Sequence, residues 1–259
     1  MSDPPARPSP GAAPAERKLI IAAVAISVAL TGWMALRLAG GGARRPAQSG
    51  APEVSVTGAG SALRPSPAGT IDIPWLPDTV ARHRPVLLAA AGRHQVDPEL
   101  LAIVTLVESG GYTRATSPSG ARGLMQIMPS TGKVIASERA LEEHSSDRLY
   151  DPAYNIDFGA FYLAEQLNAF GTSDPEESVE LAAAAYNGGP SRLRRYLEDA
   201  GTQSAQTTRY RHWVRSMWEE RALAKSPTYA AWYEAGGHRL VDLGRAEMAG
   251  KYPRGTFAP

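Results

Sequence analysis

The chain has 259 residues, 43% of them hydrophobic, which is enough for one or two domains with a substantial core. Its 27 basic residues nearly balance its 26 acidic residues, so net charge gives no reason to expect a nucleic-acid partner. The sequence contains no cysteine, which excludes disulfides, thiolate nucleophiles and cysteine-ligated zinc.

The first predicted element is an uncharged apolar run over residues 19–36. At about 1.5 Å of rise per residue it would span roughly 27 Å as a helix, close to the thickness of a bilayer's hydrocarbon core. We therefore predict a single transmembrane anchor that follows a short N-terminal tail, residues 1–18. The alternative is a cleaved signal peptide and secretion, although the apolar part of such peptides usually covers only about 7–15 residues. Basic residues flank both ends of the run, so charge does not orient it.

Residues 37–76 are rich in Gly, Pro and Ala and are predicted to form a flexible linker. Such a composition buries too little apolar surface to offset the entropy lost on ordering. A helical domain is predicted over residues 77–223. Residues 224–259 form a C-terminal extension of unknown role, in which a short helix from Pro227 to Tyr233 ends at Gly236.

Several helices are expected within residues 77–223. Asp97 and Pro98 are predicted to begin a helix that is apolar almost all round and ends at Gly110. Others are expected over residues 152–170, residues 175–186, from Ser191 as a cap to Glu198, and residues 210–223. No segment alternates convincingly as a strand does, so the predicted fold class is all-α.

Glu108 is the only charged residue between Glu99 and Arg114, near the end of the most apolar predicted helix. Burial disfavours the charged form of a carboxyl group. A carboxylic acid that keeps its proton near neutral pH is what protonation of a glycosidic oxygen requires. The alternative interpretation is a glutamate at a helix end that turns to solvent.

Glu108 belongs to the first of four short motifs that are spaced along the chain. The apolar helix closes with Glu108-Ser109, SPSGARGLMQIMP covers residues 117–129, DPAYNIDFGAFYL covers residues 151–163, and AYNGGP covers residues 185–190. Together they resemble the motifs of the soluble lytic transglycosylases, which share the goose-type lysozyme fold. The resemblance covers roughly residues 77–223 and implies that fold.

The sequence departs from the family pattern in two places. Gly111 stands where an aromatic residue is often found, and Tyr112-Thr113 replaces an Asn-Pro pair. Of the family's late ET-x-x-YV motif only Tyr210 is carried over, because the acidic residue and the Val are lost.

The resemblance implies a peptidoglycan lytic transglycosylase that cleaves between N-acetylmuramic acid and N-acetylglucosamine. Glu108 is expected to protonate the bridging oxygen and then to accept the proton of the C6 hydroxyl, which closes a 1,6-anhydro ring. The resemblance implies that the substrate's acetamido group stabilises the cationic centre, since the motif residues expected near the sugar, such as Ser117, Gln126 and Asn187, are neutral and offer no second carboxylate. Tyr186 is expected to place its hydroxyl near Glu108. Substrate contacts are implied for Ser117, Met125, Gln126, Met128, Tyr186, Asn187 and Tyr210.

Structural roles compete for several of these residues. Ser117 is also suited to turn chemistry before Pro118, Gln126 to bracing the loop, Met125 to filling the core, and Asn187 to bridging structural elements. Tyr186 could be a core aromatic residue. Asp151 and Asn155 are read as structural, a helix cap and a loop anchor.

No metal and no cofactor are expected, since the five histidines show no metal-ligand spacing. Because peptidoglycan lies outside the inner membrane, the resemblance implies a single-pass inner-membrane protein with its catalytic domain in the periplasm. Two other functions stay open. One is a hydrolytic muramidase of the same fold, and the other is a non-catalytic wall-binding or scaffold protein of an envelope-spanning assembly.

Overall fold

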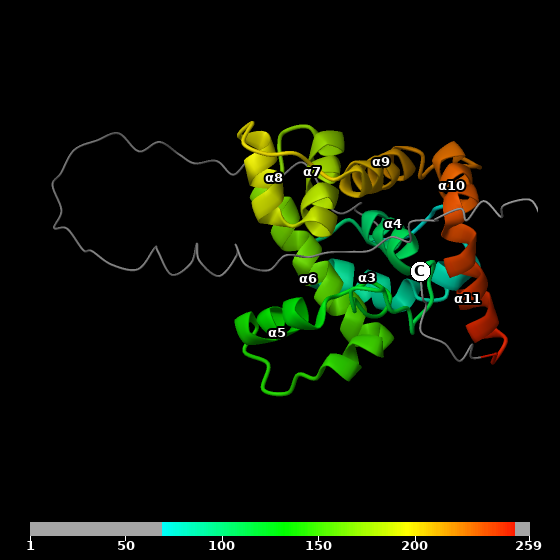
Figure 1. Ribbon diagram of the computed structural model, residues 1–259. Helices are drawn as coiled ribbons and strands as arrows, with labels where there is room; N and C mark the ends of the chain where they lie inside the picture. The colour runs from blue at the N-terminus through cyan, green and yellow to red at the C-terminus, as the bar shows by residue number, and fades with distance from the viewer. Residues whose placement is uncertain (1–68, 252–259) are drawn as a thin grey trace, which may run out of the picture.

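The structure is a computed structural model that describes residues 69–251, and Figure 1 shows them as coloured ribbons. The predicted cytoplasmic tail, the membrane span of residues 19–36 and most of the linker lie outside the described residues. Within residues 69–251, no helix is both long enough and apolar enough to cross a bilayer.

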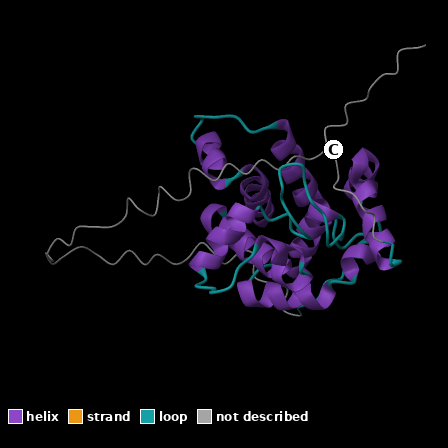
Figure 2. Cartoon of the chain, turned by 60° about the horizontal axis from the view of Figure 1, so that its bottom comes forward, coloured by secondary structure: helices purple, strands orange, loops and turns teal. Residues whose placement is uncertain are grey.

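Helices joined by loops make up the described part of the chain, as Figure 2 shows. Its only β contacts are isolated bridges that Arg122 makes with Thr116 and Ile127. The all-α prediction is therefore confirmed for these residues. In chain order the helices are α2 (Asp78–Ala81), α3 (Arg84–His94), α4 (Pro98–Ser109), α5 (Pro129–Glu138), the 3₁₀ turn η2 (Ser146–Tyr150), α6 (Pro152–Phe170), α7 (Pro175–Gly188), α8 (Pro190–Leu197), α9 (Ala205–Glu219), α10 (Pro227–Trp232), the π turn η3 (Tyr233–Gly237) and α11 (His238–Met248).

Helix α4 begins and ends where the sequence predicts. The Asp97 carboxylate accepts hydrogen bonds from the backbone N–H groups of Glu99 and Leu100, at 2.8 and 3.2 Å. Pro98 occupies the first turn, where no N–H donor is needed. Gly110 ends the helix in the left-handed conformation, with φ at 59°. Helix α6 also has its predicted bounds, and the Asp151 carboxylate caps it.

Two helix starts differ from the prediction. Helix α8 begins at Pro190 with Gly189 as its cap residue, so Ser191 does not cap it. Proline pre-sets the φ angle of a first helical turn, which explains the earlier start. Helix α9 begins at Ala205, five residues before the expected start at 210, because the Ser204 hydroxyl accepts the N–H of Thr207 and caps it. Helices α3, α5 and α11 were not predicted.

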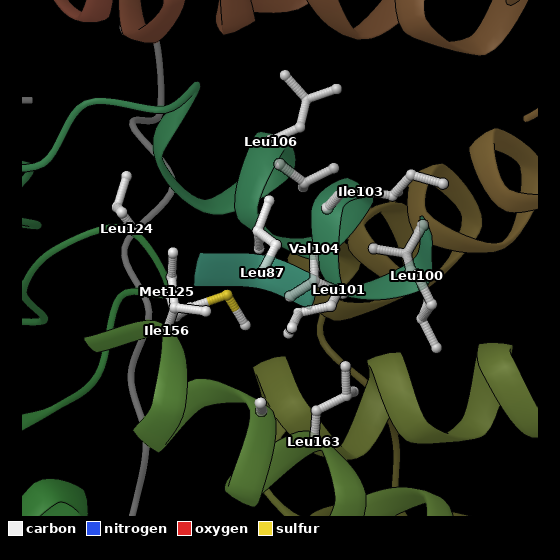
Figure 3. Close-up of a cluster of buried hydrophobic side chains, with 14 of the residues drawn as sticks. Leu87, Leu100, Leu101, Ile103, Val104, Leu106, Leu124, Met125, Ile156 and Leu163 are labelled. Carbon is white, nitrogen blue, oxygen red and sulfur yellow. The ribbon is translucent and has the colours of Figure 1, made fainter. Parts of the chain in front are cut away.

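Helix α4 lies in the middle of the domain (Figure 1), and every residue of it except Glu99 is buried. Figure 3 shows its leucine, isoleucine and valine side chains between Leu87 of α3, Leu124 and Met125 of the following loop, and Ile156 and Leu163 of α6. Each such side chain stabilises the fold by about 1.5–3 kcal/mol when fully buried. Helix α4 is thus a fixed internal scaffold for the residues at its C-terminal end.

Both flanking segments belong to this same core. Ile71, Ile73 and Leu76, which the sequence places in the linker, are buried, so the prediction of a flexible linker is wrong for residues 71–76. Trp75 stacks on Tyr229 of α10, with ring centroids 5.5 Å apart. The C-terminal extension contributes buried side chains of its own from α10 and α11, which run along one side of the domain (Figure 1).

Candidate active site

Glu108 is the second-to-last residue of α4, and only 7% of its surface is exposed. The Tyr210 hydroxyl, from α9, donates a hydrogen bond of 2.7 Å to its Oε1 atom. The carbonyl oxygen of a protonated carboxyl and an oxygen of a carboxylate can both accept this bond, so it is retained when Glu108 gains or loses its proton. The carboxyl group therefore does not turn to open solvent, in contrast to the alternative interpretation of the sequence.

Burial raises the pKa of Glu108 from an ordinary value of 4.5 to about 8, because desolvation disfavours the carboxylate. The hydrogen bond from Tyr210 acts in the opposite direction and lowers this pKa. No second carboxyl group of residues 69–251 figures among the causes of the shift. A carboxyl with a pKa near 8 can both donate and accept a proton in the neutral range.

The two tyrosines that interact electrostatically with this carboxyl keep their protons near neutral pH. Burial, with the charge of Glu108 as a further cause, raises the pKa of Tyr186 and of Tyr210 well above 10. Tyr210 was assigned from the sequence with little support, yet it makes the direct contact. A helical stripe of buried residues on α9 (Thr207, Tyr210, Val214 and Met217) is the sequence signal that could have placed it there.

The Tyr186 hydroxyl bonds elsewhere than expected. It donates a hydrogen bond of 2.8 Å to the backbone carbonyl of Met125, and its ring packs against Tyr162 at 5.2 Å between centroids. Tyr186 thus ties α7 to the loop after α4, and Glu108 affects it through space without a hydrogen bond between them.

Residues of the loop between α4 and α5 mostly brace the loop itself. Gln126 has a positive φ of 47°, and its side-chain Nε2 donates to the carbonyls of Ala115 and Gly123, at 3.2 and 2.9 Å. The Ser117 hydroxyl accepts the N–H of Ala121 at 3.0 Å. In this structure both side chains have the structural roles that the sequence left open for them.

Met125 fills the core. It is 0% exposed, its sulfur accepts a hydrogen bond of 2.9 Å from Thr105, and it packs where Gly159 leaves room on α6. Met125 therefore presents no exposed surface for the sugar contact that the resemblance implies. Asn155 anchors the same loop, accepting the N–H of Met125 and donating to two backbone carbonyls.

Asn187 and Met128 are placed differently. Asn187 is 3% exposed and accepts a hydrogen bond of 3.2 Å from Thr207, while its Nδ2 has no hydrogen-bond partner among the described residues. Met128 directly precedes α5 and is partly buried. Nowhere in residues 69–251 do three or more His, Asp or Glu side chains gather as metal ligands would.

A comparison with known protein families matches the part of the chain that contains Glu108. The family described as "Transglycosylase SLT domain" matches residues 85–208, which run from α3 into the first turn of α9 and include Glu108 and all four motifs. Residues 85–208 form a transglycosylase SLT domain. Tyr210, the hydrogen-bond partner of Glu108, lies two residues beyond the matched part of this SLT domain.

Similar proteins include a transglycosylase of Enterobacteria phage PRD1, 41% identical over 101 residues, which are 39% of this chain and 32% of that protein. An endo-type membrane-bound lytic murein transglycosylase A of Klebsiella pneumoniae is 33% identical over 135 residues, which are 49% of this chain and 66% of that protein. Among solved structures, an inactive mutant of the lytic transglycosylase Slt of Pseudomonas aeruginosa aligns with a TM-score of 0.47 and 28% identity, over 56% of this chain and 25% of that one. This chain thus spans less than two thirds of each of these relatives.

Proposed function

We propose that the SLT domain is a peptidoglycan lytic transglycosylase in which Glu108 is the single general acid and base. The observation that carries the proposal is the buried carboxyl of Glu108, with its raised pKa and its bond to Tyr210, inside a matched SLT domain. The relatives named lytic murein transglycosylases support the substrate class.

In the first step Glu108 protonates the oxygen that links N-acetylmuramic acid to N-acetylglucosamine, and the bond from that oxygen to C1 breaks. A carboxyl group with a pKa of about 8 is mostly protonated at pH 7 and so begins the cycle as an acid. The hydrogen bond from Tyr210 then stabilises the carboxylate that forms.

In the second step the Glu108 carboxylate removes the proton of the C6 hydroxyl, whose oxygen bonds to C1 and closes the 1,6-anhydro ring. The proton lost in the first step is thereby recovered, and no water is consumed. A retaining glycosidase would instead need a second carboxylate roughly 5 Å away. Here the substrate's acetamido oxygen stabilises the cationic centre in place of a second carboxylate. The causes of the Glu108 pKa shift support this step, since they include no other carboxyl group of the described residues.

Substrate contacts are proposed for side chains that still have an unused hydrogen-bond donor or apolar surface. A buried donor without a partner costs about 1–3 kcal/mol, so the free Nδ2 of Asn187 is suited to a sugar hydroxyl or acetamido oxygen. Met128 can offer apolar surface to a sugar face. Ser117, Gln126 and Tyr186 act mainly by shaping the loop near Glu108, while Tyr210 acts on Glu108 itself.

Product analysis tests the proposal. Purified sacculi are digested with the full chain and with Glu108→Gln, which keeps the shape of the side chain and removes its acidic proton. Mass spectrometry is expected to find 1,6-anhydro ends with the wild type and none with the variant. Reducing ends would instead indicate a hydrolytic muramidase, and equal release by both proteins would refute catalysis by Glu108.

We further propose that residues 19–36 anchor the protein in the inner membrane and that the SLT domain acts in the periplasm. The proposal rests on the apolar run, on the position of the substrate and on the membrane-bound relatives. A reporter fused after Thr70 is expected to be active only when exported. Activity confined to the cytoplasm would refute this orientation, and a mature protein that begins after residue 36 would indicate a cleaved signal peptide.

A further inference from the structure

The turn that follows Glu108 is held between two helices that lie outside the matched residues 85–208. Gly110 and Gly111 both have positive φ, at 59° and 82°. A Cβ on Gly110 would lie 2.6 Å from the backbone nitrogen of Val241 in α11, and one on Gly111 would lie 2.3 Å from the carbonyl oxygen of Thr79 in α2. Such distances leave no room for a side chain, so the two helices fix this turn from both sides.

Glu247, near the end of α11, binds the chain just beyond this turn. Its side chain is only 8% exposed. One carboxylate oxygen accepts the backbone N–H of Thr113 at 3.3 Å, and the other accepts the Thr113 hydroxyl. A carboxylate 134 residues further along the sequence thus holds the segment that leaves the catalytic helix.

Arg82 completes the connection from the α2 side. Its guanidinium pairs with Glu247 and donates from the same nitrogen to the carbonyl of Gly111, at 3.0 Å. A second bond, of 3.2 Å, goes to the carbonyl of Thr79. The adjacent His83 ring accepts from Arg82, and burial lowers the pKa of His83 to about 4, so this histidine is neutral and does not compete for Glu247.

We propose that Glu247 is a positioning residue for Glu108, acting with Arg82 through the turn that ends α4. The inference rests on the proposed function of Glu108. Glu108 is in the last turn of α4, so the path of Gly110 and Gly111 sets how its carboxyl meets Tyr210 and how well water is excluded from it. A displacement of about 1 Å at such a group can lower a rate by roughly 100-fold. The C-terminal segment is then part of the catalytic unit.

Two measurements on the full chain test the role of Glu247. The first is the pKa of the Glu108 carboxyl by NMR titration with ¹³C-labelled glutamate, with Glu108→Gln identifying the signal. The second is the pair kcat and KM on purified glycan strands. Glu247→Gln removes the charge and keeps the shape of the side chain. It is expected to lower kcat by about 10-fold or more with little change in KM. It is also expected to lower the Glu108 pKa from about 8 toward its ordinary value, because water reaches the carboxyl.

Two control variants separate positioning from stability. Asp242→Asn removes a charge from the exposed side of α11, where Asp242 pairs with Arg245, and both readouts should be unchanged. Asp157→Asn removes a carboxylate that binds Arg93, His94 and Arg139 and so joins α6 to α3 and to the residue that follows α5. It should lower stability and leave the Glu108 pKa unchanged.

The outcomes are distinguishable. If folded Glu247→Gln keeps both the wild-type kcat and the wild-type Glu108 pKa, the positioning role is refuted. If Glu247→Gln does not fold, Thr113→Val removes only the hydroxyl donor to Glu247, and the same two readouts decide, with smaller changes expected. A wild-type protein that cleaves no glycan would refute the proposed function, and the Glu108 pKa would then decide the positioning role alone.

Discussion

Substitution of Glu108 by Gln should make the protein more stable near neutral pH, although it is expected to abolish activity. In the folded protein the pKa of Glu108 is about 8, and in the unfolded chain it returns to about 4.5. Between these values the folded state binds a proton that the unfolded state has released. Stability therefore falls as pH rises above 4.5, and the loss levels off above pH 8. Glutamine is neutral in both states and has no such penalty.

The size of the effect follows from the two pKa values. At about 1.36 kcal/mol per pH unit, the interval from 4.5 to 7 gives a penalty on the order of 3 kcal/mol at pH 7, and the full interval gives on the order of 5 kcal/mol at pH 8. The glutamine carbonyl can still accept the hydrogen bond from Tyr210, so the fold around it is retained.

Urea unfolding of the full chain and of Glu108→Gln, measured from pH 4.5 to pH 9, provides the assay. Every other titrating group is common to both proteins, so the difference between the two free energies of unfolding isolates Glu108. It should grow with pH and level off near pH 8. A difference that stays constant over this range would refute the view of Glu108 as a buried neutral acid.

Three further predictions concern the surroundings of this carboxyl. Tyr210→Phe removes the one hydrogen bond that lowers the pKa of Glu108, so the alkaline limb of the pH–kcat profile should move to higher pH while the maximal rate falls; an unchanged profile would contradict the assigned contact. Asn155→Ala leaves a buried N–H and two carbonyls without their side-chain partner, and urea unfolding should show a loss of about 3 kcal/mol or more. Gly111→Ala forces a Cβ into the backbone of α2 and should destabilise the protein. The loss should be several times the ~1 kcal/mol expected for the control Gly120→Ala, because Gly120 also has a positive φ but has open space around it. An equal decrease of Tm in the two variants would argue against the close packing of α2 on Gly111.

The burial of Glu108 could be predicted because it depends on local sequence. An aspartate cap, a proline in the first turn and apolar residues on every face define α4 without knowledge of its neighbours. The fold class followed in the same way, from helical periodicity and the four motifs. Asp151 and Asn155 were also correctly read as a cap and a loop anchor.

The partners of Glu108 could not be predicted as well, because they depend on packing between distant segments. Tyr210 reaches Glu108 across 102 positions of sequence, and the motif that usually marks it is mostly lost. Tyr186 and Met125 lie in well-matched motifs, yet only the packing shows that one bonds to the other's carbonyl. The buried residues of 71–76 are few and stand among polar and proline residues, so composition alone suggested a linker.

The position of Tyr210 has a practical consequence for anyone who isolates the domain. A fragment trimmed to residues 85–208 would keep Glu108 and all four motifs. It would lack the Tyr210 hydroxyl, which stabilises the carboxylate form of Glu108, and it would lack α2 and α11, which contact the turn after α4. Such a fragment would be a poor guide to the behaviour of the intact protein. Recombinant versions should extend from at least Gly69 to Lys251.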